Sequence, residues 1–309
     1  MHHKERGTQA GALIRFAIIG VQENKGIGMR RACAVFFALA TCLFSQDQLK
    51  RAEELYQRTS YTASLALLHG MQGNAAAEFL MGKDYFMLGE YKKATDAFQK
   101  ALAVEPRKSE YAHWLGRAYG RRAETSSWFS APGYASKARQ YFEQAVALDP
   151  SNGEAMNDLF DYYLEAPGFL GGGYEKAQAV AERIAKRNAA EGHFAQAQLA
   201  DRRREYDTAE EQLRRAMEIA PQVGRILDLA KYLAKRGRYQ ESDEFFAKAE
   251  QVAPNAPRIM FAKANAYVQQ KRNLTQAREL LVKYLQSDLS PDDPPRDAAK
   301  KLLKQASGG

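Results

Sequence analysis

Only a few stretches of this chain combine residue types that could do chemistry. The most suggestive is APGFLGGGYEKA, Ala166–Ala177, where three consecutive glycines precede an expected helix. A phosphate-binding loop follows a strand and ends in Gly-Lys-Ser/Thr, because the loop amides and the lysine bind the phosphate together. Here the expected approach is helical, Leu159–Glu165, and Tyr174-Glu175 occupy the Lys-Ser/Thr positions. We interpret the stretch as a turn between two helices, with anion binding at the helix amides as the alternative.

Candidate catalytic and metal-binding residues are sparse elsewhere. After residue 45 the sequence has three histidines, His69, His113 and His193, in three separate segments, and it has no cysteine. A metal site needs several ligands close together, and a nucleophile needs a neighbouring base. Glu154 and Asp161 lie seven residues apart on one helical face, a spacing without specificity. The sequence therefore predicts no enzyme activity, no metal and no cofactor.

Composition and charge favour a helical protein and disfavour nucleic acid as a partner. Ala, Leu, Glu, Lys, Arg and Gln dominate, so we expect helix nearly everywhere and no strand. The net charge is +8, of which residues 1–45 contribute +4 and the remainder +4. In the remainder the two signs alternate along the expected helices, whereas a protein that follows a phosphate backbone carries a basic block or stripe.

The first 45 residues have the layout of an export signal behind an unusual leader. Met29-Arg30-Arg31 is followed by a 13-residue apolar run, Ala32–Phe44, and then by polar residues. Such a run is typical of a secretory signal peptide and too short to span a bilayer comfortably. We therefore expect a periplasmic or secreted protein without a transmembrane span in its mature chain. The expected divisions are a leader over 1–28 upstream of the true start, a signal peptide over 29–45, and one mature domain over 46–309.

Two alternatives remain open for this N-terminal segment. The apolar run could be a buried helix of the mature protein. Leu39-Ala40-Thr41-Cys42 is also close to a bacterial lipobox, although threonine before the cysteine and Leu-Phe after it match poorly, so lipid anchoring through Cys42 is less favoured. If the signal is removed, both cysteines leave with it, and the mature chain has no disulfide.

An internal pattern first becomes clear over residues 75–108, AAAEFLMGKDYFMLGEYKKATDAFQKALAVEPRK. This 34-residue stretch has small residues, aromatic residues and a proline at fixed places, namely Gly82, Tyr85, Ala94, Phe98, Ala101 and Pro106. Small residues let two antiparallel helices approach, the aromatic residues fill the space between them, and the proline ends the second helix. The pattern resembles the tetratricopeptide repeat (TPR) at each of these places.

Further copies cover almost all of the chain after residue 45. The copies are a degenerate first one over 46–74, then 109–152, 153–189, 190–222, 223–256 and 257–290, followed by an amphipathic stretch over 296–306. One hairpin cannot bury its own apolar face, so the copies must stack. The resemblance implies an all-α solenoid, a right-handed superhelix of six to seven helical hairpins with a C-terminal capping helix. It also implies a concave wall that binds peptides or protein segments.

In this family the first helix of each hairpin faces the concave wall. The residues that fall at inward places form the expected groove: Phe79, Lys83, Phe86, His113, Arg117, Arg121, Phe194, Lys231 and Phe261. Apolar anchors separated by cations suit an extended peptide or an amphipathic helix with acidic residues. The alternative is a solvated wall without a partner. The paired Lys/Asn residues by which some family members grip a terminal carboxylate do not recur here.

Two insertions lengthen the turns of neighbouring hairpins. The first is Thr125–Tyr134, with ten extra residues, and the second is the glycine-rich turn, with five. Stacked repeats place equivalent turns side by side, so we expect a second apolar surface there, the loop edge: Trp128, Phe129, Phe169, Leu170 and Tyr174. The loop edge either contacts a partner or packs back on the helices.

Three functions are compatible with the sequence. The first is a non-catalytic exported scaffold or adaptor that binds a protein or peptide in the groove, and the chain resembles exported bacterial TPR proteins. The second is a periplasmic carrier or transport-partner protein for a small apolar ligand, which would need an enclosed apolar pocket. The third is an assembly role through self-stacking as a weak homo-oligomer.

Overall fold

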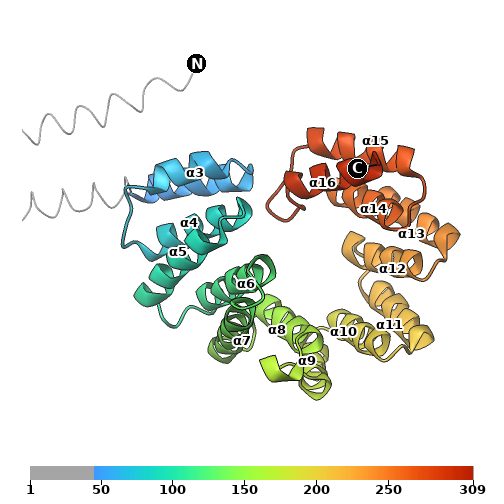
Figure 1. Ribbon diagram of the computed structural model, residues 1–309, viewed down its shortest axis with the longest axis horizontal. Coiled ribbons are helices and arrows are strands. Elements are labelled where there is room, and N and C mark those ends of the chain that lie inside the picture. Colours follow the sequence, from blue (N-terminus) through green and yellow to red (C-terminus); the bar gives the residue numbers. More distant parts are fainter. Residues whose placement is uncertain (1–44, 309) are drawn as a thin grey trace, which may run out of the picture. The chain divides into compact units, whose positions relative to one another are not determined.

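The computed structural model describes residues 45–308, where all regular structure is helical (Figure 1). Of these, the residues from 52 onward form one compact unit, and the account below concerns that unit. The expected leader and all but the last residue of the expected signal peptide lie outside the described residues. Within the described part no strand occurs, which confirms the all-α prediction.

The helices follow one another as hairpins in chain order. After helical residues 52–57 come α3 (Tyr61–Leu68), α4 (Ala75–Met87), α5 (Tyr91–Val104), α6 (Ser109–Thr125), α7 (Ala131–Leu148), α8 (Gly153–Glu165), the 3-10 turn η1 (Gly168–Leu170), α9 (Tyr174–Arg187), α10 (Ala189–Arg202), α11 (Tyr206–Ile219), α12 (Val223–Lys235), α13 (Tyr239–Val252), α14 (Pro257–Gln269), α15 (Leu274–Gln286) and α16 (Arg296–Ala306). From α3 to α16 each helix packs against the next one, and the hairpins stack as the repeat pattern predicts.

Local sequence determines where several of these helices begin and end. The side chains of Asn74, Asn152 and Asn188 each accept a hydrogen bond from the backbone N–H three residues later, at 3.1, 3.0 and 3.1 Å. These bonds satisfy amides that the first turn of a helix leaves unpaired. Gly89 and Gly237 follow α4 and α12 with φ of 76° and 77°, a left-handed conformation that glycine adopts at no steric cost.

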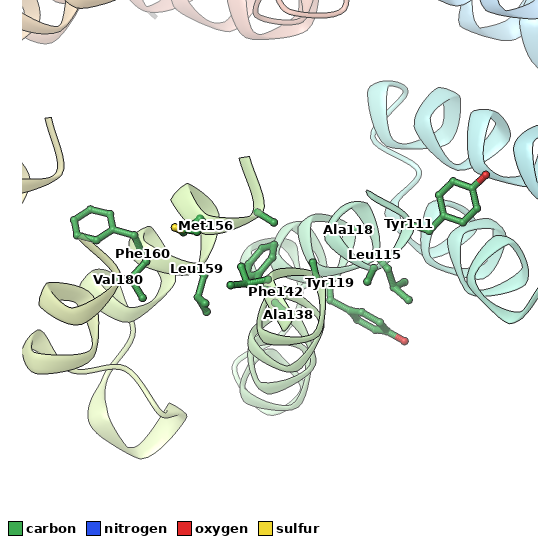
Figure 2. Close-up of a cluster of buried hydrophobic side chains, with 14 of the residues drawn as sticks. Tyr111, Leu115, Ala118, Tyr119, Ala138, Phe142, Met156, Leu159, Phe160 and Val180 are labelled. Atoms are coloured by element: carbon green, nitrogen blue, oxygen red, sulfur yellow. The ribbon is translucent and has the colours of Figure 1, made fainter. Parts of the chain in front are cut away.

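The core lies between the two helices of each hairpin and between successive hairpins. Figure 2 shows the part built by α6 to α9, where Leu115, Phe142, Leu159 and Phe160 are all buried. Two further clusters of buried residues follow, one from α10 to α14 and one from α14 to α16. This chain of local clusters is expected of a repeat protein, in which each repeat contacts its neighbours.

The C-terminal helix α16 closes the last cluster. Its Ala299, Leu302 and Ala306 are buried against α14 and α15, and the rest of the helix carries the charged residues. The capping helix predicted over 296–306 is thereby confirmed.

Half of the ten-residue insertion is helical, which differs from the loop expected over Thr125–Tyr134. α6 has 17 residues and α7 has 18, against 13 or 14 in the helices of the hairpins that follow, and only residues 126–130 connect them. Pro132 lies in the first turn of α7, where a missing N–H costs nothing, and Tyr134 is inside the helix. The insertion therefore lengthens a helical hairpin.

The glycine-rich stretch is a turn between α8 and α9, as the sequence predicts. Gly171 has φ of 88°, and a Cβ on the buried Gly172 would lie 1.8 Å from the carbonyl oxygen of Ala166. The Tyr162 hydroxyl donates to the carbonyl oxygen of Leu170 at 2.9 Å, and Lys176 Nζ donates to the carbonyl oxygen of Gly171 at 2.8 Å. The glycines are thus needed for the close approach of the backbone.

Candidate protein-binding site

The first helices of successive hairpins share an open face, which we call the inner wall. A pocket of about 900 Å³ on this wall is formed by α8, α10 and α12 together with the start of α11. Phe194, Tyr206 and Tyr232 give it aromatic sides. Eight of the fifteen lining residues are charged: Glu165, Asp201, Arg202, Arg204, Asp228, Lys231, Lys235 and Arg236. The pocket is therefore an aromatic trough with charged rims.

An aromatic cluster forms the part of the inner wall contributed by α4 and α6. The ring of Trp114 meets that of Phe86 edge to face at 5.4 Å between centroids. The guanidinium of Arg117 lies 4.3 Å from the Trp114 ring centroid and 5.5 Å from that of Phe86. All three side chains are half-buried. Aromatic and arginine side chains in such partly desolvated positions are the types that dominate binding energies at protein interfaces.

Lys83 is held by aromatic rings. Its Nζ lies 4.5 Å from the ring centroid of Tyr56, 5.3 Å from that of Trp114 and 5.6 Å from that of Phe79. Among residues 45–308 it forms no ion pair. Cation–π contacts orient the ammonium group without neutralising it, so Lys83 can still attract a carboxylate.

Two of the predicted groove residues are in the core, which corrects their placement on the wall surface. Phe79 is 8% exposed and stacks on Tyr111 at 4.5 Å between ring centroids. His113 is 1% exposed, and its Nε2 lies 2.8 Å from Asp158 Oδ2. The neighbouring α6 side chain that reaches the wall is the half-buried Trp114, which the inward places of the repeat did not include. Trp114 could have been recognised from the sequence, because it is a large and rare aromatic residue next to the predicted inward position His113.

Asp158 belongs to an acidic stripe on α8. Glu154, Asp158, Asp161 and Glu165 are spaced four, three and four residues apart, which aligns them along one helical face. Asp158 also lies 3.7 Å from Nε of Arg117. The pKa of Asp161 is raised to about 6, mainly because the wall reduces the hydration of its carboxylate and secondly because Asp158 repels it. Part of the Asp161 side chain is nevertheless exposed to solvent. The sequence showed Glu154 and Asp161 on one helical face, but the predicted groove of apolar anchors and cations did not include the full stripe.

The remaining predicted cations have carboxylate neighbours. Lys231 Nζ lies 2.8 Å from Asp228 Oδ1, and Arg121 pairs with Glu124 while it contacts the Tyr91 hydroxyl at 3.2 Å. These pairs are exposed, so they restrain the cations but leave them in contact with water.

The predicted apolar anchors Phe194 and Phe261 are half-buried. The Phe194 ring lies 4.3 Å below the guanidinium of Arg225, and the Phe261 ring packs at 5.4 Å from that of Tyr284. Each presents only part of its ring to the wall.

The loop edge divides into packed and exposed members. Leu170 and Tyr174 are half-buried, and the guanidinium of Arg203 lies 4.1 Å from the Tyr174 ring centroid. In contrast, Trp128 and Phe129 are each 76% exposed and Phe169 is 82% exposed. Among the described residues no ring contact joins Phe169 to the other two. The tip between α6 and α7 and the glycine-rich turn are therefore separate exposed features.

Other kinds of site find no support in residues 45–308. No group of three or more His, Cys, Asp or Glu side chains there is placed to hold a metal ion. None of the helices in this range combines the length and the apolar character needed to cross a membrane.

Comparisons with known proteins agree with this architecture. Models of the tetratricopeptide repeat match residues 75–108, 171–223 and 227–294, which together make up half of the chain. The chain belongs to the tetratricopeptide repeat family. A search of curated proteins found no match. The repeats of this family form scaffolds for protein–protein interactions, and the family is generally non-catalytic.

Several solved bacterial structures resemble the chain. A tetratricopeptide repeat protein from Parabacteroides merdae is 14% identical and aligns over 85% of this chain and 99% of its own, with a TM-score of 0.56. A thermophilic TPR protein of Thermus thermophilus is 22% identical over 64% of this chain and 98% of its own, with a TM-score of 0.49. The first of these two matches, at 14% identity, supports the fold alone.

Proposed function

We propose that this TPR protein is a scaffold whose inner wall binds an extended or helical segment of another protein. The observation that carries the proposal is the half-exposed cluster of Phe86, Trp114 and Arg117, on the same series of helices as the 900 Å³ trough. Rigid aromatic anchors next to a wide trough suit a segment with large side chains at intervals.

The charges of the wall narrow the chemistry of the segment. Lys83 at one part of the wall favours an acidic residue, whereas the stripe Glu154–Glu165 on α8 favours a basic one. A uniformly acidic partner, which the predicted cations alone suggested, would be repelled by α8. We infer a mixed-charge segment that places a basic residue opposite α8, because opposed charges set register and exclude wrong partners.

The apolar-ligand alternative has weaker support. A small-molecule pocket is mostly apolar with a few polar groups. The largest described pocket instead has a majority of charged lining residues and opens on the wall. These features favour a polypeptide.

We further propose that the protein is exported, with residues 29–45 as the signal peptide. The support is the Arg30-Arg31 start and the short apolar run after it. Intact-mass analysis of protein from the native host tests this, and we expect a chain that begins near Gln46. A product that retains residues 1–45 would contradict export, and a lipid mass on Cys42 would favour anchoring.

Site-specific photo-crosslinking tests the wall as the binding surface. A photoreactive amino acid is placed at Met87 or Gln198 on the wall and, as controls, at Ala179 or Ala247, which are exposed on α9 and α13. We expect the same partner to be captured from both wall positions and from neither control. Capture from the controls alone would mean that the partner binds the second helices of the hairpins, such as α9 and α13, and not the inner wall.

A further inference from the structure

The hairpin α6–α7 ends in an exposed aromatic tip. Relative to the first helices of 13 residues, α6 is longer by four residues, which at 1.5 Å per residue extends it by about 6 Å. At this end Trp128 and Phe129 stack on each other, with ring centroids 3.7 Å apart and planes 28° from parallel. Each is 76% exposed, so most of the surface of both side chains faces solvent.

The tip itself carries no charge. From Thr125 to Ser136 the sequence TSSWFSAPGYAS has neither acidic nor basic residues. The hydroxyls of Ser127 and Ser130 share a hydrogen bond of 3.2 Å, so these two polar side chains of the connection are partners for each other.

Cations without carboxylate partners lie on the helices next to the tip. Lys92 and Arg122 line the same hollow as Thr125 and Ser126, on one side of the connection. Arg122 donates to the hydroxyls of Thr95 and Tyr134 at 2.9 and 2.6 Å, and its charge is not matched by a carboxylate.

One further cation lies on α7. Lys137, in the second turn of α7, lies 5.1 Å from the ring centroid of Tyr119. In the described chain it forms no ion pair. The nearest acids of these turns, Glu90 and Glu124, pair instead with Lys93 and Arg121.

The geometry points to a membrane contact: the α6–α7 tip inserts Trp128 and Phe129 into the headgroup region of a bilayer that contains anionic lipids. Aromatic rings prefer the membrane–water interface, and each nearby Lys or Arg strengthens attraction to an anionic leaflet. The rings protrude, are uncharged and are flanked by unpaired cations, a shape that suits a soft planar surface better than a protein pocket. The inference is independent of the partner proposed for the inner wall.

The two tryptophans of the chain allow a direct test. Trp114→Phe leaves Trp128 as the only tryptophan, so its emission reports the environment of the tip. Trp128 emission is measured in place of total vesicle binding, because the apolar run 32–44 could bind the full chain to lipid without the tip. We expect a blue shift, and quenching by brominated lipids, on addition of phosphatidylglycerol-containing vesicles. The matched variant Trp128→Phe retains only Trp114, whose emission should not change.

Substitutions in the Trp114→Phe background separate the two contributions. Phe129→Ser should raise the lipid concentration at half-maximal shift about tenfold, because one aromatic side chain no longer leaves water. Lys137→Gln should raise it about fivefold with anionic vesicles and leave it unchanged with pure phosphatidylcholine. Ile219→Ser, which removes a 52% exposed apolar side chain at the end of α11, is the control and should have no effect.

Three results would overturn the inference. One is that the folded protein binds anionic vesicles while the emission of Trp128 stays unchanged. Another is an equal response of Phe129→Ser and its parent. The third is a Trp128 shift that appears only with a soluble protein fraction, which would make the tip a protein-binding surface.

Discussion

Phe142 of α7 lies directly against the backbone of Gly116 in α6, so closely that a Cβ at position 116 would come within 2.7 Å of the phenyl ring and 3.3 Å of the Ala138 carbonyl oxygen. Gly82 and Phe98 repeat the relationship one hairpin earlier, where the added atom would be 2.4 Å from the ring. The repeat pattern thus corresponds to a physical requirement: a small residue on one helix admits an aromatic ring from the other.

Gly116→Leu should destabilise the protein by about 1–3 kcal/mol or more, because overpacking displaces Phe142 from a closely packed site. Gly120→Ala in the same helix is the control, since its added Cβ meets nothing within 4 Å and alanine favours helix by about 0.5–1 kcal/mol. Urea unfolding followed by circular dichroism gives both free energies of unfolding. Equal stability of the wild type and Gly116→Leu would contradict the assigned register.

Asp84 should make the stability depend on pH. This carboxyl is fully buried between α3 and α4, and neither of its oxygens has a hydrogen-bond partner in the described structure. Burial raises its pKa from 3.8 to about 7, against smaller opposing effects of Ser64 and Lys83. A raised carboxyl pKa means that ionisation opposes folding, so the free energy of unfolding should fall as pH rises from about 4 to about 7.

Asp84→Asn tests the pH dependence. At pH 8 the substitution should stabilise the protein by about 2–4 kcal/mol. The difference should become small near pH 4, where the native carboxyl is protonated and the unfolded one only partly ionised, and it should vanish at still lower pH. Asp96→Asn, on the exposed face of α5, is the matched control. Denaturation at both pH values gives the result, and a stabilisation of the same size at pH 4 would show that ionisation is not its cause.

The aromatic cluster of the inner wall should contribute most of the affinity for a partner segment. Phe86→Ala with Arg117→Ala should cost about 2 kcal/mol or more, because truncated anchors leave desolvated positions empty. Val252→Ala with Lys248→Ala, on exposed positions of α13, should change affinity little. Isothermal titration with the captured segment measures both. A larger loss for Trp128→Ser with Phe169→Ser than for the wall variant would move the main binding site to the loop edge.

The acidic stripe should make binding of a basic segment sensitive to mild acid. Because the pKa of Asp161 is raised to about 6, lowering the pH through that value removes one negative charge from α8, and affinity should decrease. Asp161→Asn should bind more weakly than the wild type above pH 6 and match it below. A pH series of the dissociation constant provides the measurement, and parallel curves for the two proteins would exclude Asp161 as the responsive group.

The sequence by itself determined the repeat architecture, the capping helix and the nature of the glycine-rich turn. These features depend on short-range physics. The spacing of Gly82, Phe98 and Pro106 encodes a hairpin, asparagine caps begin helices, and Gly172 is required where the backbone approaches itself. A pattern that recurs along the chain also averages out local ambiguity, which is why the repeat boundaries were predicted well.

Only the tertiary structure decided which side chains face the inner wall and which charged groups lie next to them. Successive helical residues point about 100° apart, so the choice between His113 and Trp114 depends on how α6 rotates against α4 and α8. That rotation buries Phe79 and His113, leaves Trp114 half-exposed, and joins His113 and Arg117 to Asp158, 45 and 41 residues further along the chain. The exposure of Trp128 likewise follows from a helical extension that composition alone did not predict. Helix formation is a local property of this sequence, whereas the wall and the tip result from contacts between helices that are distant in sequence.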